Sequence, residues 1–155
     1  MPMLLFGYGN PARGDDALGP LFVERLGELL PEHPEWGELR LLTDFQLQPE
    51  HALDLDGCRR VIFVDASLSC PAPFAFSVIE PAPGFGCTTH GMSPEALLAV
   101  FRKVCGREPP PAWMLGVRAE SFGLGEPPGE AARSHLEAAL AFACRLLAAG
   151  RPRVG

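Results

Sequence analysis

The sequence predicts an α/β protein, a single domain with a small, mostly parallel central sheet of about five strands flanked by helices on both faces. Its 155 residues fit one ordinary domain. Short apolar runs alternate with helical segments along the chain. Because strands that are joined by helices pair in parallel through right-handed crossovers, both faces of such a sheet are covered. We expect the domain to span residues 1–150 and residues 151–155 to form a frayed tail.

The strands are predicted from short apolar runs that are rich in Val, Ile and Phe and are bounded by turn residues. They are expected at residues 3–8, 38–43, 61–65, 74–80 and 112–118.

The helices are predicted from apolar residues that recur on one helical face and from residues typical of helix ends. They are expected at residues 16–30, 49–57, 94–105 and 128–149. Pro31 stops the first, Ser93 caps the third with Pro94 at its first position, and Gly150 ends the last.

Composition excludes several function classes. The net charge of -6, with Lys103 as the one lysine, argues against a nucleic-acid partner. The first residues show no basic segment and no apolar stretch of signal-peptide length, so we expect no export. The apolar stretch 136–149 is interrupted by Glu137 and Arg145 and is too short to span a bilayer. Five cysteines without a Cys-x-x-Cys pair fit a reducing compartment. We therefore expect a cytoplasmic protein with no membrane role.

The opening strand runs into a glycine-rich turn that ends in two acids. A strand, a glycine turn and a helix start often bind phosphate. Here Gly7, Gly9 and Gly14 do not have the dinucleotide spacing, and the acids Asp15 and Asp16 would repel a pyrophosphate. A nucleotide site is therefore disfavoured, although a nucleotide-binding enzyme remains a third, weaker alternative.

Three polar side chains follow predicted strands. Asp16 follows the first strand, Asp65 ends the third and His90 lies in the loop after the fourth. Ligand sites of parallel sheets lie beyond the carboxyl ends of the strands, and carboxylate and imidazole ligands suit nickel or zinc. Alternatively, Asp16 is an acid favoured by the helix dipole and His90 an ordinary loop histidine. Asp65 is harder to explain in this way, because an acid after four apolar residues is costly unless it is paired or used.

The other histidines occupy positions that commonly face solvent. His33 lies in a polar segment, His51 at a helix start and His135 on the last helix. They are therefore weaker candidates for the site than His90.

The motifs resemble those of the hydrogenase maturation proteases, in order and over most of the chain. The residues that carry the resemblance are Gly7-Tyr8-Gly9-Asn10, Arg13-Gly14-Asp15-Asp16, Gly19, Val64-Asp65-Ala66 and Thr89-His90. The family trims a carboxyl-terminal peptide from the large subunit of nickel–iron hydrogenases after nickel insertion, and its fold is a compact α/β sandwich of the phosphorylase/hydrolase-like type. Residues 46–50 and 121–126 are similar to the branch that serves NAD-reducing bidirectional hydrogenases.

The resemblance implies a function and a site. It implies an endopeptidase whose catalytic and metal-binding residues are Asp16, Asp65 and His90, with nickel coming from the active site of the substrate. The implied partner is the precursor of the hydrogenase large subunit, and we expect the protease to be a monomer. Two departures concern the first motif: Asp16 stands where some relatives have Glu, and Ala17 where many have Gly. The alternative is a nickel-sensing binding module or chaperone that uses the same ligands without proteolysis.

Overall fold

The protein has a five-stranded, mostly parallel sheet, as predicted. The computed structural model describes residues 1–82 and 91–150. In this part of the chain the strands follow the order β2-β1-β3-β5-β4 across the sheet. Their bounds are β1 Met3–Tyr8, β2 Leu39–Asp44, β3 Arg60–Ser67, β4 Phe74–Ile79 and β5 Ala112–Arg118. Only β4, at one edge, is antiparallel to its neighbour, β5.

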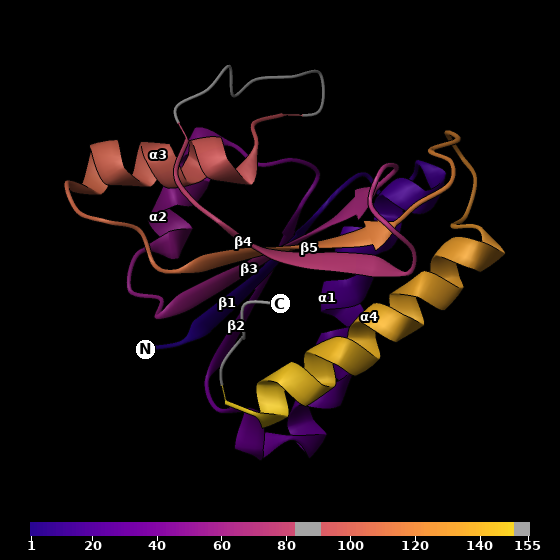
Figure 1. Ribbon diagram of the computed structural model, residues 1–155, viewed down its shortest axis with the longest axis horizontal. Coiled ribbons are helices and arrows are strands. Elements are labelled where there is room, and N and C mark those ends of the chain that lie inside the picture. Colours follow the sequence, from indigo (N-terminus) through magenta and orange to yellow (C-terminus); the bar gives the residue numbers. More distant parts are fainter. Residues whose placement is uncertain (83–90, 151–155) are drawn as a thin grey trace.

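Helices cover both faces of this sheet (Figure 1). Their bounds are α1 Leu18–Leu29, α2 Ala52–Leu55, α3 Pro94–Cys105 and α4 Glu130–Ala148. Helices α1 and α4 pack on one face, and α2 and α3 pack on the other. The predicted single-domain α/β class with helices on both faces is confirmed.

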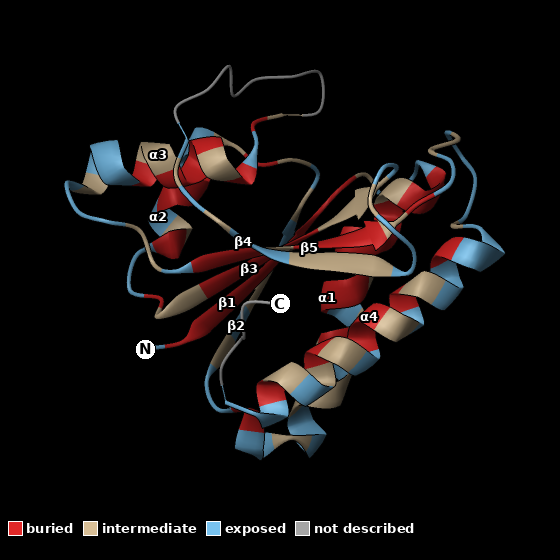
Figure 2. Cartoon of the chain, in the orientation of Figure 1, coloured by how far each residue is buried: buried red, intermediate tan, exposed pale blue. Residues whose placement is uncertain are grey.

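The central strands are buried because both of their faces carry apolar side chains. In β1, Leu4 and Phe6 contribute to the core under α2 and α3, whereas Met3 and Leu5 contribute to the core under α1 and α4. This alternation follows from the two-residue period of a strand. Figure 2 shows the result as buried central strands between the inward faces of the helices. The acidic residues that follow such strands therefore stand at the edge of a rigid core.

The helix ends differ in detail from the predictions. The first helix starts with a 3₁₀ turn, η1, at Gly14–Ala17, and the α-helix proper begins at Leu18. The short helix predicted at residues 49–57 is a 3₁₀ turn at Pro49–His51 followed by the single turn α2. The predicted cap of α3 is confirmed, since the Ser93 hydroxyl oxygen accepts a hydrogen bond from the Ala96 N–H at 3.1 Å.

Two glycines bring α1 into direct contact with β1 and so place η1 over the end of that strand. A Cβ at Gly7 would overlap the carbonyl oxygen of Gly19. A Cβ at Gly19 would lie 2.7 Å from the carbonyl oxygen of Val64 in β3. Neither position has room for a methyl group, because the contacting atoms belong to the backbone.

Gly19→Ala is expected to lower the free energy of unfolding by about 2–3 kcal/mol, because backbone must shift to admit the methyl group. Gly27→Ala, in the same helix, is the matched control, since its Cβ would lie 3.4 Å from Leu41 Cδ1. It should be neutral or raise stability by up to about 1 kcal/mol through helix propensity. Denaturant unfolding measures both; equal effects of the two variants would contradict this account of the packing.

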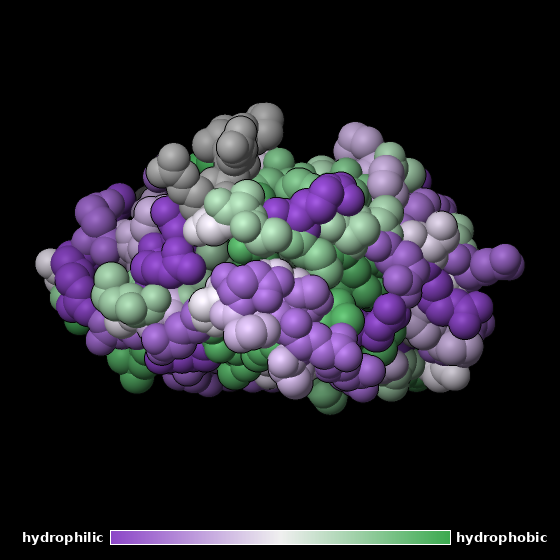
Figure 3. All heavy atoms as spheres, turned by 90° about the horizontal axis from the view of Figure 1, so that it is seen from below, coloured by the Kyte–Doolittle hydropathy of each residue, from purple (hydrophilic) through white to green (hydrophobic). Residues whose placement is uncertain are grey.

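The surface is mixed in character. Hydrophilic residues cover much of the face in Figure 3, with hydrophobic residues grouped between them. Within the described residues, no helix combines the length and apolar character that crossing a membrane requires.

Candidate functional site

A cavity opens at the carboxyl ends of β1 and β3. Its volume is about 420 Å³. From β1 the chain passes to β2 on one side and then returns to β3 on the other, so the sheet order reverses between β1 and β3. Such a reversal leaves a crevice in which α/β proteins bind ligands. The described lining residues are Tyr8, Gly9, Asn10, Arg13, Asp16, Phe45, Gln46, Asp65, Ala66, Leu68 and Phe122.

Asp16 reaches this cavity from η1. Its Oδ2 accepts a hydrogen bond from the Asn10 N–H at 2.9 Å, which ties the 3₁₀ turn to the end of β1. Gly9 has a φ of 147°, and a Cβ there would overlap the Asp16 carbonyl oxygen. The glycine turn therefore serves to bring Asp16 back over the strand end.

Asp65 reaches the cavity from β3, which continues two residues beyond the predicted end, to Ser67. The pairing of β1 with β3 ends at Val64, whereas Asp65 pairs only with Gly116 of β5. Its Oδ1 accepts a hydrogen bond from the Ala66 N–H at 2.8 Å. Burial, and next the negative charge of Asp16, raise the pKa of Asp65 from 3.8 to about 8.

The two carboxyl groups therefore form a pair that favours a cation. Because burial and the charge of Asp16 disfavour its ionised form, Asp65 holds a proton near neutral pH and would release it to a metal ion. Tyr8 lies beside them; burial, with the charges of Asp65 and Glu95, raises its pKa well above 10, so it remains a neutral phenol. The arrangement can hold a cation, and it can accept or donate a proton at Asp65.

Of the three predicted site residues, the structure brings Asp16 and Asp65 to one cavity. His90 lies outside the described residues. Within residues 1–82 and 91–150, no three His, Cys, Asp or Glu side chains are grouped closely enough to hold a metal ion. The described chain resumes at Gly91, where a Cβ would lie 2.8 Å from the Cβ of Gln46, a residue of the cavity wall.

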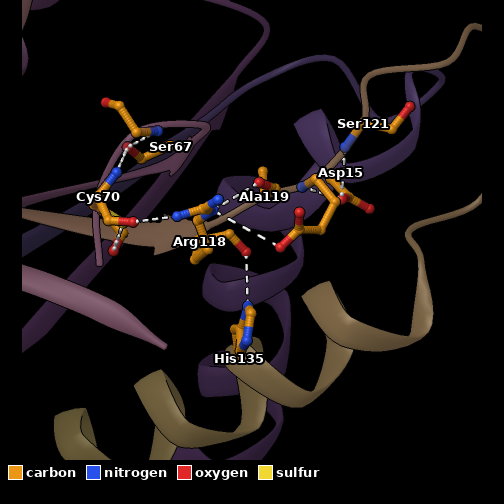
Figure 4. A network of polar contacts seen from close by, with 10 residues as sticks. Asp15, Ser67, Cys70, Arg118, Ala119, Ser121 and His135 are labelled. Atoms are coloured by element: carbon orange, nitrogen blue, oxygen red, sulfur yellow. Dashed lines mark hydrogen bonds and ion pairs between the residues drawn. The ribbon is translucent and has the colours of Figure 1, made fainter. Parts of the chain in front are cut away.

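Asp15, next to Asp16, has a structural role. It is buried, and its Oδ2 accepts hydrogen bonds from the Glu120 N–H at 2.7 Å and the Ser121 N–H at 3.1 Å (Figure 4). Its Oδ1 accepts one from the Gly129 N–H at 2.7 Å, just before α4. Burial opposes ionisation of this carboxyl group, but the three hydrogen bonds outweigh it and lower the pKa. Asp15 thus fixes η1 against the loop after β5.

The expectation that His51 faces solvent is wrong. It is buried, with its ring edge-on to Phe6 at 4.8 Å between centroids. Its Nδ1 accepts a hydrogen bond from the Gln48 N–H at 2.9 Å, so its Nε2 carries the hydrogen that is donated to Asp44 Oδ2 at 3.0 Å. Gln48 and His51 form a capping box at the start of this short helix.

The remaining histidines lie away from the cavity lining. His33 is partly exposed and stacks on Trp36, with ring centroids 4.2 Å apart. His135 is partly buried, and its Nδ1 lies 3.0 Å from the Arg118 carbonyl oxygen. His33 and His135 thus have structural neighbours of their own.

Apolar lining residues were missed by sequence reasoning. Phe45 and Leu68 follow β2 and β3 directly, and Phe122 lies in the loop after β5. Their positions just beyond strand ends are the available signal, because that edge of the sheet collects the ligand-binding residues.

Comparison with known proteins supports the resemblance seen in the motifs. No model of a known protein family and no curated protein matches the sequence. Among solved structures, the NiFe hydrogenase maturation protease HycI from Thermococcus kodakarensis is 25% identical, with a TM-score of 0.71, covering 94% of this chain and 92% of its own. The hydrogenase 2 maturation peptidase of a Thaumarchaeota archaeon is 26% identical, with a TM-score of 0.66, covering 95% of this chain and 98% of its own.

A third structure, the hydrogenase maturating endopeptidase HybD from E. coli, is 24% identical, with a TM-score of 0.75, covering 97% of this chain and 94% of its own. The chain has the fold of the hydrogenase maturation proteases. The predicted resemblance to these proteases and the expectation of a peptide hydrolase are confirmed. The branch that serves NAD-reducing hydrogenases stays a prediction.

Proposed function

We propose that this protein is an endopeptidase that removes a carboxyl-terminal peptide from the nickel-loaded large-subunit precursor of a nickel–iron hydrogenase. The observation that carries the proposal is the convergence of Asp16 and Asp65 on one cavity at the reversal point of the sheet. The similar solved structures are proteases of hydrogenase maturation, which supplies the substrate class. We further propose that the protein acts as a monomer in the cytoplasm, where its free thiols at residues 58, 70, 105 and 144 suit a reducing environment.

In this proposal Asp16, Asp65 and His90 recognise the nickel of the substrate. The two carboxylates offer oxygen ligands, and an imidazole is a nitrogen ligand that suits nickel. The placement of Gly91 against Gln46 supports His90 as the third ligand, because its covalent neighbour lies at the cavity wall. The nickel belongs to the substrate, so a precursor without nickel would lack the ion that these three ligands bind.

The carboxyl pair also provides the proton transfers that peptide hydrolysis needs. A bound cation polarises a peptide carbonyl and lowers the pKa of water. Asp16 or Asp65 accepts a proton as the water oxygen bonds to the carbonyl carbon, and the proton passes to the leaving amine as the C–N bond breaks. The raised pKa of Asp65 suits this exchange near neutral pH.

The test is to mix the protein with nickel-loaded precursor and to weigh the products. We expect a large subunit that is shorter by one carboxyl-terminal peptide, and an unchanged mass when the precursor lacks nickel. Stable binding of the loaded precursor without loss of mass would instead support the chaperone alternative.

His90→Ala is expected to abolish this processing, because it removes the proposed nitrogen ligand. His33→Ala is a control histidine away from the cavity lining and should process normally. Far-ultraviolet circular dichroism checks that both variants fold. Full processing by folded His90→Ala at ordinary precursor concentrations would remove His90 from the ligand set.

A further inference from the structure

Two large apolar side chains stand exposed at the mouth of the carboxylate cavity. Phe45 has 65% of its surface exposed and Leu68 has 54%. Single exposed apolar residues are ordinary on protein surfaces. These two differ because both line the cavity that also holds Asp16 and Asp65.

The two side chains come from strands on opposite sides of β1. Phe45 follows β2 and Leu68 follows β3, and these strands are the neighbours of β1 in the sheet. Phe45 and Leu68 therefore flank the strand end over which the glycine turn folds Asp16. We call this pair the apolar rim.

The backbone on each side of the apolar rim is fixed by hydrogen bonds. The Phe45 N–H donates to Asp44 Oδ1 at 2.7 Å, and the other oxygen of Asp44 accepts from the buried ring of His51 at 3.0 Å. Next to Leu68, the Ser67 hydroxyl oxygen accepts from the Cys70 N–H at 3.0 Å. Because these hydrogen bonds hold the backbone beside the apolar rim, little backbone conformational entropy is lost when the apolar rim is covered.

We infer that the apolar rim binds an extended segment of the precursor that adjoins the scissile bond and carries large apolar side chains. This inference rests on the proposed function, because the occupant is the peptide that enters the carboxylate cavity. Continuity with the cavity supports it: Phe45 and Leu68 line the same cavity as Asp16 and Asp65, so a peptide whose carbonyl reaches the two carboxyl groups has these exposed apolar side chains beside it. The apolar rim would then recognise the precursor residues beside the scissile bond, while Asp16 and Asp65 bind the nickel of the precursor.

The test compares Phe45→Ala and Leu68→Ala with two matched controls. The controls are Leu53→Ala and Val104→Ala, whose side chains are 64% and 62% exposed on α2 and α3 and do not line the cavity. Each rim variant should raise the KM for nickel-loaded precursor by about tenfold with kcat changed less than about twofold, as expected for lost apolar contact. The controls should match the unmodified protein in both constants.

A second measurement identifies the occupant. Residues flanking the cut in the precursor are changed one at a time to serine, and each substrate is assayed with the unmodified protein and with Phe45→Ala. Where an apolar substrate residue contacts Phe45, its change to serine should raise KM about tenfold with the unmodified protein and much less with Phe45→Ala, because the effects of contacting residues are not additive.

Each outcome separates the inference from the function on which it rests. If the unmodified protein cleaves the precursor while both rim variants keep its KM, the apolar rim does not bind substrate and the proposed function stands. If both rim variants and both controls raise KM equally, the effect is general and the inference is wrong. If the unmodified protein does not cleave loaded precursor, the proposed function fails, and the inference fails with it.

Discussion

Asp16→Asn is expected to abolish precursor processing without loss of stability. The asparagine side-chain oxygen can still accept the Asn10 N–H, so η1 keeps its hydrogen bond to the end of β1. The lost charge removes a metal ligand and a proton acceptor, which should lower kcat/KM by at least about 10³-fold. The free energy of unfolding should stay within about 0.5 kcal/mol of the unmodified protein. Processing is measured by mass spectrometry and stability by denaturant unfolding.

Asp15→Asn, one residue away, is the matched comparison. It should lower stability but leave the binding of loaded precursor intact. Three backbone N–H groups, from Glu120, Ser121 and Gly129, converge on the Asp15 carboxylate. An asparagine offers one acceptor oxygen and turns an NH₂ group toward a donor, which should lower the free energy of unfolding by about 2–4 kcal/mol. Folded Asp15→Asn should still bind loaded precursor, because its side chain does not line the cavity.

The pH dependence of Asp15→Asn provides an internal check. The pKa of Asp15 is lowered in the folded protein, so the unfolded chain takes up the proton first as the pH falls. The stability that Asp15 contributes is therefore complete above its ordinary pKa of 3.8 and is lost as the pH falls through the lower folded value. The difference in the free energy of unfolding between the unmodified protein and Asp15→Asn should shrink over that range.

Two outcomes would contradict these predictions. Normal processing by Asp16→Asn would show that Asp16 is not needed for the reaction. Unaltered stability of Asp15→Asn would show that Asp15 does not anchor η1.

Two kinds of information in the sequence predict part of the fold and of the site: local apolar patterns, and the rule on where parallel sheets bind ligands. The strands at residues 3–8 and 112–118 were predicted at their observed bounds, because the first apolar run ends at Gly9 and the second begins directly after Pro111. The rule that parallel strands gather ligands at their carboxyl ends then placed Asp16 and Asp65 together.

Other features depend on contacts that no local pattern reports. The position of β4 beside β5 depends on pairing between strands that are distant in the sequence. Only the direction of β4 has a local signal: the segment between Ser67 and Phe74 is too short to hold the helix that a parallel crossover needs. The burial of His51 depends on its contacts with Asp44 and Phe6. Both residues lie outside the short helix that holds His51, so the apolar pattern of that helix does not report these contacts. The apolar rim was missed because a lone Phe or Leu in a loop has no periodicity.

Asp65→Asn is expected to stabilise the fold while it removes the activity. Burial and the charge of Asp16 raise the pKa of Asp65 from 3.8 to about 8, so the folded protein keeps a proton that the unfolded chain has released. Between these two values the folded state binds more protons, and its stability falls as the pH rises. Asparagine has no charge to bury, and its oxygen can still accept the Ala66 N–H.

The gain in stability from Asp65→Asn should therefore depend on pH. It should be near zero below pH 4, grow through the window between 3.8 and about 8, and level off above it. Because one pKa unit corresponds to about 1.4 kcal/mol, a gain of at least about 2 kcal/mol is expected at pH 8. Denaturant unfolding of both proteins at pH 4, 6 and 8 measures it, alongside the processing assay at pH 8.

A carboxylate kept at the cost of stability is typical of a functional site. If Asp65→Asn gains stability with rising pH and no longer processes the precursor, Asp65 is retained for function. If instead it loses stability at pH 8, the charged carboxylate is stabilised by the fold, and the cavity is not poised to take up a cation. If it gains stability but processes normally, Asp16 alone carries the carboxylate role, and the proton transfers assigned to the pair belong to it.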